Sequence, residues 1–210
     1  MTVINKSNSL VYLVDDEFVM RDSLTLLIES TGLTVRSFES APEFLDHYDS
    51  KQPSCLVLDV RMPTITGLEL QEELVKRAIA IPIIFISGNA DIPDSAKAFR
   101  AGAIDFLQKP FDHTVLLMRI QEALKKDHEF REKAIETATL QQRINRLTLR
   151  EKEVLSLVVS YRSNKEIGKL LQVSNRTIDA HRANIMRKLH AESLPELVLM
   201  VRESDLLKDD

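Results

Sequence analysis

The chain has 210 residues, of which 44% are hydrophobic and 29% charged, and its formal net charge at pH 7 is −4. This balance is typical of a folded globular protein and argues against a long disordered chain. No apolar run approaches the ~20 residues that cross a bilayer, and residues 1–8 show no leader pattern, so we expect a cytosolic protein. Cys55 is the only cysteine, which excludes a disulfide framework and a cysteine-based metal site.

Charge is unevenly distributed along the chain. Residues 1–112 carry 10 Lys and Arg against 17 Asp and Glu, whereas residues 148–190 carry 9 against 4. A compact basic segment in an acidic chain indicates an anionic partner for that segment. The alternative is an ordinary solvated helical face, which charge alone does not exclude.

Short apolar runs alternate with amphipathic stretches through the first half of the chain. Helical patterns begin near Val19, Ala41, Gly67, Ile92 and His113. Five such strand–helix units in about 125 residues predict an α/β fold, a parallel sheet with helices on both faces. The strands are expected at residues 10–14, 34–38, 55–58, 81–86 and 104–107.

From residue 113 to 146 the sequence is charged and contains neither Gly nor Pro. Its apolar positions keep no clean heptad, so a solvent-exposed helix is favoured over a dimerising coiled coil. We interpret this stretch as the last helix of the first domain running on into a polar helical linker. The predicted limits are 1–125 for the first domain, 126–146 for the linker and 147–210 for the second domain.

A Ser or Thr followed three residues later by Glu is the pattern of a capping box, which marks where helices begin. The pattern begins at Ser40, Thr66, Thr148, Ser163 and Ser193. Ser174 is a further expected N-cap, before a helix over residues 175–189. The last part of the chain is therefore predicted to be a small all-α domain of four helices. The tight turn at residues 172–174 is typical of a helix-turn-helix.

Polar residues gather where the predicted strands end. Asp15 and Asp16 follow the first strand, Asp59 the third, Ser87 the fourth and Lys109 the fifth. Ligands bind outside the carboxyl ends of the strands in open parallel sheets, so these side chains are expected at one edge. Three carboxylates in one place repel one another unless a cation neutralises them, and hard oxygen ligands favour Mg²⁺. Beside a lysine and a hydroxyl, such a carboxylate is suited to accept a phosphoryl group.

These stretches resemble the receiver domain of response regulators over roughly residues 9–125. The matching segments are residues 14–17, 58–63 with Gly67, 86–88, 101–103 and 109–111. The resemblance implies a flavodoxin-like sheet of strand order 2-1-3-4-5, with Asp59 as the phospho-acceptor. It further implies that Mg²⁺ is held by Asp15, Asp16, Asp59 and the backbone carbonyl of Arg61. Lys109 and Ser87 would contact the phosphoryl group, and Phe106 would be the switch aromatic or a plain core residue.

Residues 175–189, taken as a helix, place Ile178, Ile185 and Leu189 on one buried face. A different stripe mixes arginines with small residues and can approach a DNA groove closely. Arg176, Arg182 and Lys188 are candidates for phosphate contacts, with residues near the helix start reaching base edges.

The segments 147–155, 164–167 and 177–186 resemble the NarL/FixJ (LuxR-type) helix-turn-helix. The resemblance covers about residues 145–205, and the run Arg182-Ala183-Asn184 is closer to the FixJ branch. Asp179 is placed where it could accept from a cytosine amine, or alternatively pair with a neighbouring arginine. The DNA-binding residues expected are Lys165, Arg176, Thr177, Asp179, Ala180, Arg182, Ala183, Asn184, Arg187 and Lys188.

Four positions depart from the family patterns or modify them. Thr64 stands where many relatives have Gly, and Asn89 lies close enough to Ser87 to influence how fast a phosphoryl group is lost. Tyr161 stands at a helix end where relatives usually have Gly, and it could add a phosphate contact. Because a non-Gly residue is costly in a left-handed cap, the turn at Tyr161 is expected to differ locally. Gly168 replaces a usual Ala.

The sequence thus predicts a transcriptional response regulator. A sensor histidine kinase would phosphorylate Asp59, and the protein would dimerise on promoter DNA and act through RNA polymerase. One alternative is a phospho-regulated protein-binding module. A Mg²⁺-dependent aspartyl-phosphate phosphatase is disfavoured, because that class requires a second Asp where this chain has Arg61. We therefore expect that the protein is not an enzyme, except that its receiver domain catalyses its own phosphorylation and dephosphorylation.

Overall fold

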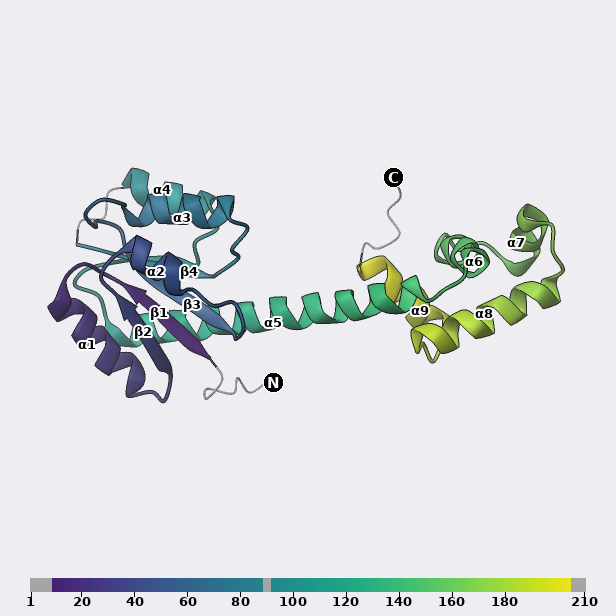
Figure 1. Ribbon diagram of the computed structural model, residues 1–210, viewed down its shortest axis with the longest axis horizontal. Helices are drawn as coiled ribbons and strands as arrows, with labels where there is room; N and C mark the ends of the chain where they lie inside the picture. Colours follow the sequence, from purple (N-terminus) through teal and green to yellow (C-terminus); the bar gives the residue numbers. More distant parts are fainter. Residues whose placement is uncertain (1–8, 89–91, 205–210) are drawn as a thin grey trace. The chain divides into compact units, whose positions relative to one another are not determined.

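The computed structural model describes residues 9–88 and 92–204. The chain divides into two compact units, residues 1–131 and 132–210 (Figure 1). No hydrophobic core cluster of the described residues includes members of both units. Within the described ranges no helix combines the length and the apolar character that a membrane crossing requires.

The first unit is built on a five-stranded parallel sheet of order β2-β1-β3-β4-β5. Strands β1, β3 and β4 are buried along their whole length, which explains why their sequences are nearly continuous apolar runs. The strands are β1 (Leu10–Val14), β2 (Thr34–Phe38), β3 (Ser54–Asp59), β4 (Ile83–Ser87) and β5 (Asp105–Gln108). The predicted parallel α/β fold is confirmed, with strand ends shifted by one or two residues.

Helices cover both faces of this sheet (Figure 1). On one face, α1 (Phe18–Glu29) and α5 (His113–Asn145) pack their apolar side chains against alternate strand residues such as Val11 and Val57. On the other face, residues of α2 (Ala41–His47), α3 (Gly67–Lys76) and α4 (Ile92–Arg100) pack against the intervening residues, such as Tyr12 and Leu56. The alternation follows from the period-two geometry of strands.

Helix α5 contains all but the last residue of the segment 126–146, which the sequence suggested was a polar linker. In the first unit, the Asp127 side chain is buried and bonded to Arg131. In the second unit, Leu140 and Ile144 belong to the hydrophobic core. Both ends of the segment are therefore parts of folded units. The apolar periodicity of the sequence did not reveal this packing, because so few apolar residues lie at either end of the segment.

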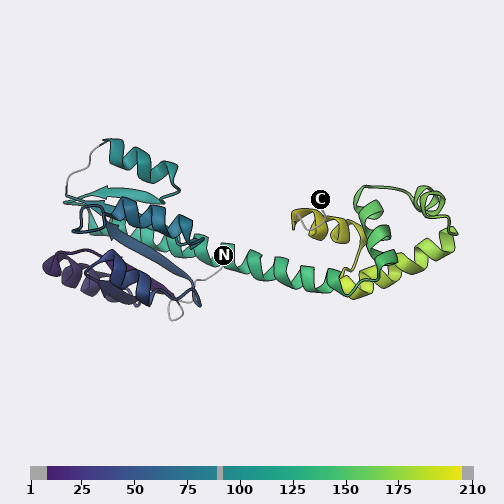
Figure 2. The same cartoon turned by 45° about the horizontal axis from the view of Figure 1, so that its top comes forward.

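The second unit contains α6 (Leu149–Val159), α7 (Asn164–Leu171), α8 (Asn175–Leu189) and α9 (Leu194–Glu203). Helices α6, α7 and α9 all pack against α8 (Figures 1 and 2). The buried face of α8 consists of Ile178, Ile185 and Leu189, as its helical spacing predicts. The predicted all-α second domain is confirmed.

Helix caps define most of these boundaries. Complete capping boxes begin at Thr66, Thr148 and Ser163, and Ser174 caps α8 by accepting from the Thr177 N–H. The capping box predicted at Ser40 is wrong: its side chain makes no cap bond, and Glu43 instead accepts from the Glu39 N–H. At Ser193 only the hydroxyl acts as a cap, because Glu196 accepts from the Glu192 N–H.

Candidate functional site

Two buried carboxylates meet at the carboxyl edge of the first unit's sheet. Asp15 directly follows β1 and Asp59 ends β3, and these two strands are hydrogen-bonded neighbours. Their side chains are 1% and 7% exposed. Lys109, which follows β5, places its Nζ atom 2.8 Å from Asp15 Oδ2 and 2.7 Å from Asp59 Oδ1. The lysine thus bridges both carboxylates and neutralises part of their mutual repulsion.

Backbone groups hold both carboxylates in place. The N–H of Arg61 donates to Asp59 Oδ2 at 2.7 Å, and the N–H of Glu17 donates to Asp15 Oδ1 at 2.9 Å. The loop after Asp59 returns at Gly67, whose N–H donates to the Val60 carbonyl at 2.9 Å. A Cβ atom at Gly67 would lie 2.3 Å from the backbone oxygen of Asp59. Only glycine therefore allows α3 to begin so close to the acceptor residue.

Burial and charge act in opposite directions on these groups. Burial raises the pKa of the Asp59 carboxyl above its ordinary value, and the contact with Lys109 reduces that rise without cancelling it. Burial also acts to lower the pKa of Lys109. Its bonds to Asp15 and Asp59 outweigh burial and leave the pKa above the ordinary value. Lys109 is therefore a fixed positive charge at neutral pH, and further positive charge near Asp59 would favour its ionised form.

The other residues predicted to act in the receiver domain differ in how far they are buried. Ser87 ends β4 and is buried, and its carbonyl accepts from the Lys109 N–H at 2.7 Å. Phe106 is half-buried, with its ring centroid 6.0 Å from that of Phe85. Asp16 is exposed. Asn89 lies outside the described residues.

The predicted metal ligands are not gathered as three carboxylates. In the portion of the chain that is described, no three His, Cys, Asp or Glu side chains lie close enough together to hold a metal ion. Asp16 therefore does not complete a cluster with Asp15 and Asp59 in this structure, where Lys109 supplies the neutralising charge. The donor chemistry still fits a hard divalent cation, because both buried groups offer carboxylate oxygens.

In the second unit, α7 and α8 are joined by the turn at residues 172–174. Gln172 adopts a left-handed conformation with φ 56° and ends α7. A Cβ atom at Gly168 would lie 2.9 Å from the Val173 carbonyl oxygen. The glycine therefore permits a close approach of turn and helix, which accounts for its departure from the usual Ala.

Most of the predicted DNA-binding residues lie on an exposed surface of α7 and α8. Thr177 and Arg182 are half-buried. The exposed members are Lys165, Arg176, Asp179, Ala180, Ala183, Asn184 and Arg187.

Lys188 differs from the other cationic candidates. Its Nζ atom lies 2.6 Å from Oε2 of Glu151, a residue that is only 4% exposed. This ion pair ties α8 to the start of α6. In this structure Lys188 therefore has an internal structural role, and the phosphate contact expected of it stays a prediction.

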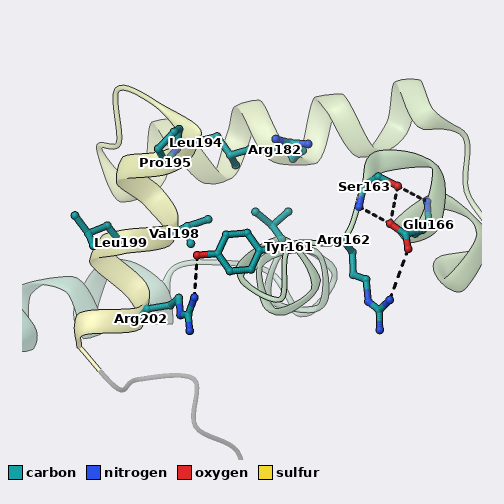
Figure 3. Close-up of a pocket in the computed structure, with 11 residues that line it drawn as sticks. Tyr161, Arg162, Ser163, Glu166, Arg182, Leu194, Pro195, Val198, Leu199 and Arg202 are labelled. Carbon is teal, nitrogen blue, oxygen red and sulfur yellow. Dashed lines mark hydrogen bonds and ion pairs between the residues drawn. The ribbon is translucent and has the colours of Figure 1, made fainter.

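Three polar contacts, made by two side chains, were not predicted from the sequence. Asn164, the first residue of α7, bonds through its side chain to both Asp179 and Arg182 of α8. Tyr161 has φ 58°, as expected for a position that favours glycine, but its hydroxyl accepts from Arg202 Nη1 at 2.8 Å. Figure 3 shows the Tyr161 hydroxyl directed toward Arg202 of α9. Both residues line a groove of about 670 Å³. This contact with Arg202 ties Tyr161 to α9, and the phosphate contact suggested for it stays a prediction.

Comparisons with known proteins agree with the two-unit division. A family model described as "Response regulator receiver domain" matches residues 11–121, and "Bacterial regulatory proteins, luxR family" matches residues 145–201. The chain is 41% identical to response regulator protein TmoT of Ectopseudomonas mendocina, over 98% of this chain and 92% of that protein. It is 40% identical to transcriptional regulatory protein FixJ of Azorhizobium caulinodans, over 90% of each.

Solved structures of response regulators are similar to this chain over nearly its whole length. Response regulator StyR matches with a TM-score of 0.81 and 41% identity, covering 93% of this chain and 99% of that chain. Full-length FixJ from B. japonicum matches with a TM-score of 0.57 and 35% identity, covering 94% and 98%.

Proposed function

Since the chain belongs to the response regulators that join a receiver domain to a luxR-family DNA-binding domain, we propose that Asp59 is its phospho-acceptor. The observation that carries this proposal is the position of Asp59, buried and bonded to Lys109 at the carboxyl edge of the sheet. A sensor histidine kinase is the proposed donor.

In this reaction an Asp59 oxygen forms a bond to phosphorus while the phosphorus–nitrogen bond of the kinase phosphohistidine breaks. The bonding electrons remain on the imidazole nitrogen, which then takes up a proton. Lys109 is already a fixed cation beside Asp59 Oδ1, so it is placed to neutralise a phosphoryl oxygen. The Arg61 N–H holds the second carboxylate oxygen, Oδ2, which restricts rotation of the acceptor.

Mg²⁺ is the proposed cofactor, with Asp15, Asp16, Asp59 and the Arg61 carbonyl as its ligands. When bound, it supplies additional neutralisation of the phosphoryl oxygens. Ser87 is proposed to bond to the phosphoryl group and Phe106 to respond to that change. We propose no enzymatic activity toward other substrates, because Arg61 stands where an aspartyl-phosphate phosphatase requires an acid.

The output is proposed to be sequence-specific binding to promoter DNA by α7 and α8. Arg176, Arg187 and Lys165 are exposed and suited to phosphate contacts, for which Arg182 and Lys188 are the further candidates. The residues proposed to face base edges are Thr177, Asp179, Ala180, Ala183 and Asn184. Phosphorylation is proposed to promote a homodimer, which strengthens binding by coupling two weak modules. RNA polymerase is the further partner proposed, in the cytoplasm.

Intact-mass measurement after incubation with acetyl phosphate and Mg²⁺ tests the acceptor assignment. We expect one added phosphoryl group on the wild-type chain and none on Asp59→Asn. Asp105→Asn, which changes an aspartate at the start of β5, is the matched control and should be modified normally. Modification that persists in Asp59→Asn would assign the acceptor elsewhere.

Sedimentation of the same samples tests the proposed dimerisation. The unmodified chain should sediment as a monomer, and the modified chain should shift toward a dimer. A tight dimer before modification would exclude this route from Asp59 to DNA.

A further inference from the structure

We propose that Asn164 is a positioning residue for DNA recognition, which holds the Asp179 carboxylate ready to accept a hydrogen bond from a base. This inference rests on the proposed DNA-binding function and names the chemistry that part of its surface would read.

Asn164 connects two positions on α8. Its Nδ2 atom donates to Asp179 Oδ1 at 2.5 Å, and its Oδ1 atom accepts from Arg182 Nη1. Asp179 and Arg182 are three residues apart in the helix and thus lie on the same side. One side chain of α7 therefore fixes two side chains of α8.

The partners also determine which way the Asn164 amide faces. A guanidinium can only donate, so the amide oxygen must face Arg182. An ionised carboxylate can only accept, so the amide nitrogen must face Asp179. The orientation of this amide, which is often ambiguous, is therefore fixed by chemistry.

Asn164 is not the N-cap residue of α7. Ser163 caps α7, and its capping box with Glu166 is complete (Figure 3). A substitution at Asn164 therefore leaves the start of α7 intact. The side chain is available for a role toward α8.

The bond to Asn164 changes what Asp179 can do near DNA. A mobile carboxylate would be driven away from the groove by the phosphates, whereas a carboxylate bonded through Oδ1 has a restricted position. Its Oδ2 atom remains suited to accept from an exocyclic amine. In the major groove such amines are N4 of cytosine and N6 of adenine. We therefore assign Asp179 an amine-bearing base as its target, with Asn164 setting its direction.

The experiment uses the full chain treated with acetyl phosphate and a duplex library randomised over the binding site. Wild type should prefer cytosine or adenine at one base pair, and Asp179→Ala should remove that preference. Asn164→Ala should weaken the same preference about tenfold, as the loss of one good base contact does. The preferences at other base pairs and the melting temperature should be unchanged.

Asn164→Asp is the informative second variant, because it keeps the size and the acceptor for Arg182 but cannot donate to Asp179. It should weaken the preference as much as Asn164→Ala does. Lys169→Ala, an exposed site on α7 with no assigned role in base recognition, should leave that preference intact. If wild type selects a sequence and both Asn164 variants select it equally well, the inference is overturned while the proposed function stands. A wild-type chain that selects no sequence overturns the proposed function and this inference with it.

Discussion

The backbone N–H of Ser54 donates to Asp127 Oδ2 at 2.8 Å, which links the first residue of β3 to a side chain of α5. The same carboxylate oxygen accepts from Arg131 Nε at 2.5 Å, and Arg131 also donates to the Ser50 carbonyl. Asp127 is 2% exposed. This buried carboxylate fastens α5 to the strand whose other end is Asp59.

Replacing Asp127 should therefore destabilise the first unit. Asp127→Ala leaves the Ser54 N–H without this acceptor and removes an ion-pair partner from Arg131. We expect a loss of about 2 kcal/mol in the free energy of unfolding, measured by urea denaturation with circular dichroism. Glu129→Ala, an exposed change on the same helix, should alter it by less than about 0.5 kcal/mol. Equal effects for the two variants would refute the structural role of Asp127.

Gly67→Ala should impair phosphorylation more than folding. The added methyl group would meet the Asp59 carbonyl oxygen, so α3 or the acceptor loop must shift. We expect phosphorylation by acetyl phosphate to slow at least about tenfold, because small displacements of reacting groups have large effects on rate. Gly88→Ala is the control, since a Cβ atom there meets no described atom within 4 Å. A normal rate for Gly67→Ala would contradict the close packing.

The ion pair between Glu151 and Lys188 predicts how the second unit responds to acid. Burial acts to raise the pKa of Glu151, but the bonds from Lys188 and Thr148 outweigh it and hold the pKa below the ordinary 4.5. A lowered folded-state pKa adds stability above about pH 4.5, and this stability is lost as the pH falls through the folded value. Glu151→Gln keeps the capping geometry but loses the charge. Its deficit in melting temperature should be largest near pH 7 and disappear on acidification; a deficit independent of pH would argue against the pair.

Arg176 and Lys188 should differ in the salt dependence of DNA binding. Arg176 is exposed on α8, whereas Lys188 is engaged by Glu151. Arg176→Ala should reduce the slope of log affinity against log salt concentration by about one, as the loss of one phosphate contact does. Lys188→Ala should leave the slope unchanged and lower the melting temperature. If Lys188→Ala reduced the slope and Arg176→Ala did not, Lys188 and not Arg176 would be the residue that contacts a phosphate.

Much of this architecture follows from the sequence, because it depends on local patterns. The apolar runs of β1 and β3 are each followed by an aspartate, and parallel strands bring their carboxyl ends to one edge. The meeting of Asp15, Asp59 and Lys109 was therefore predictable. The bridging of both carboxylates by one lysine was not, because it depends on rotamers and not on strand order.

In the second unit, too, the side-chain partners could not be predicted from the sequence. The buried face of α8 follows from helical spacing, but the partners of Lys188 and Asp179 do not. Glu151 and Asn164 lie on other helices, 37 and 15 residues away in sequence, and no periodicity connects them. In the same way, Leu140 and Ile144 were assigned to a polar linker because the core they join is supplied by later helices.

The central claim is that the phosphorylation of Asp59 controls DNA binding, and promoter affinity measured with and without acetyl phosphate tests it most directly. For wild type we predict an increase within the range of about 5- to 150-fold that is typical of coupling between sites. Asp59→Ala should bind with the lower affinity and show no response to acetyl phosphate. Binding that is equally tight with and without acetyl phosphate, and unchanged in Asp59→Ala, would contradict the account.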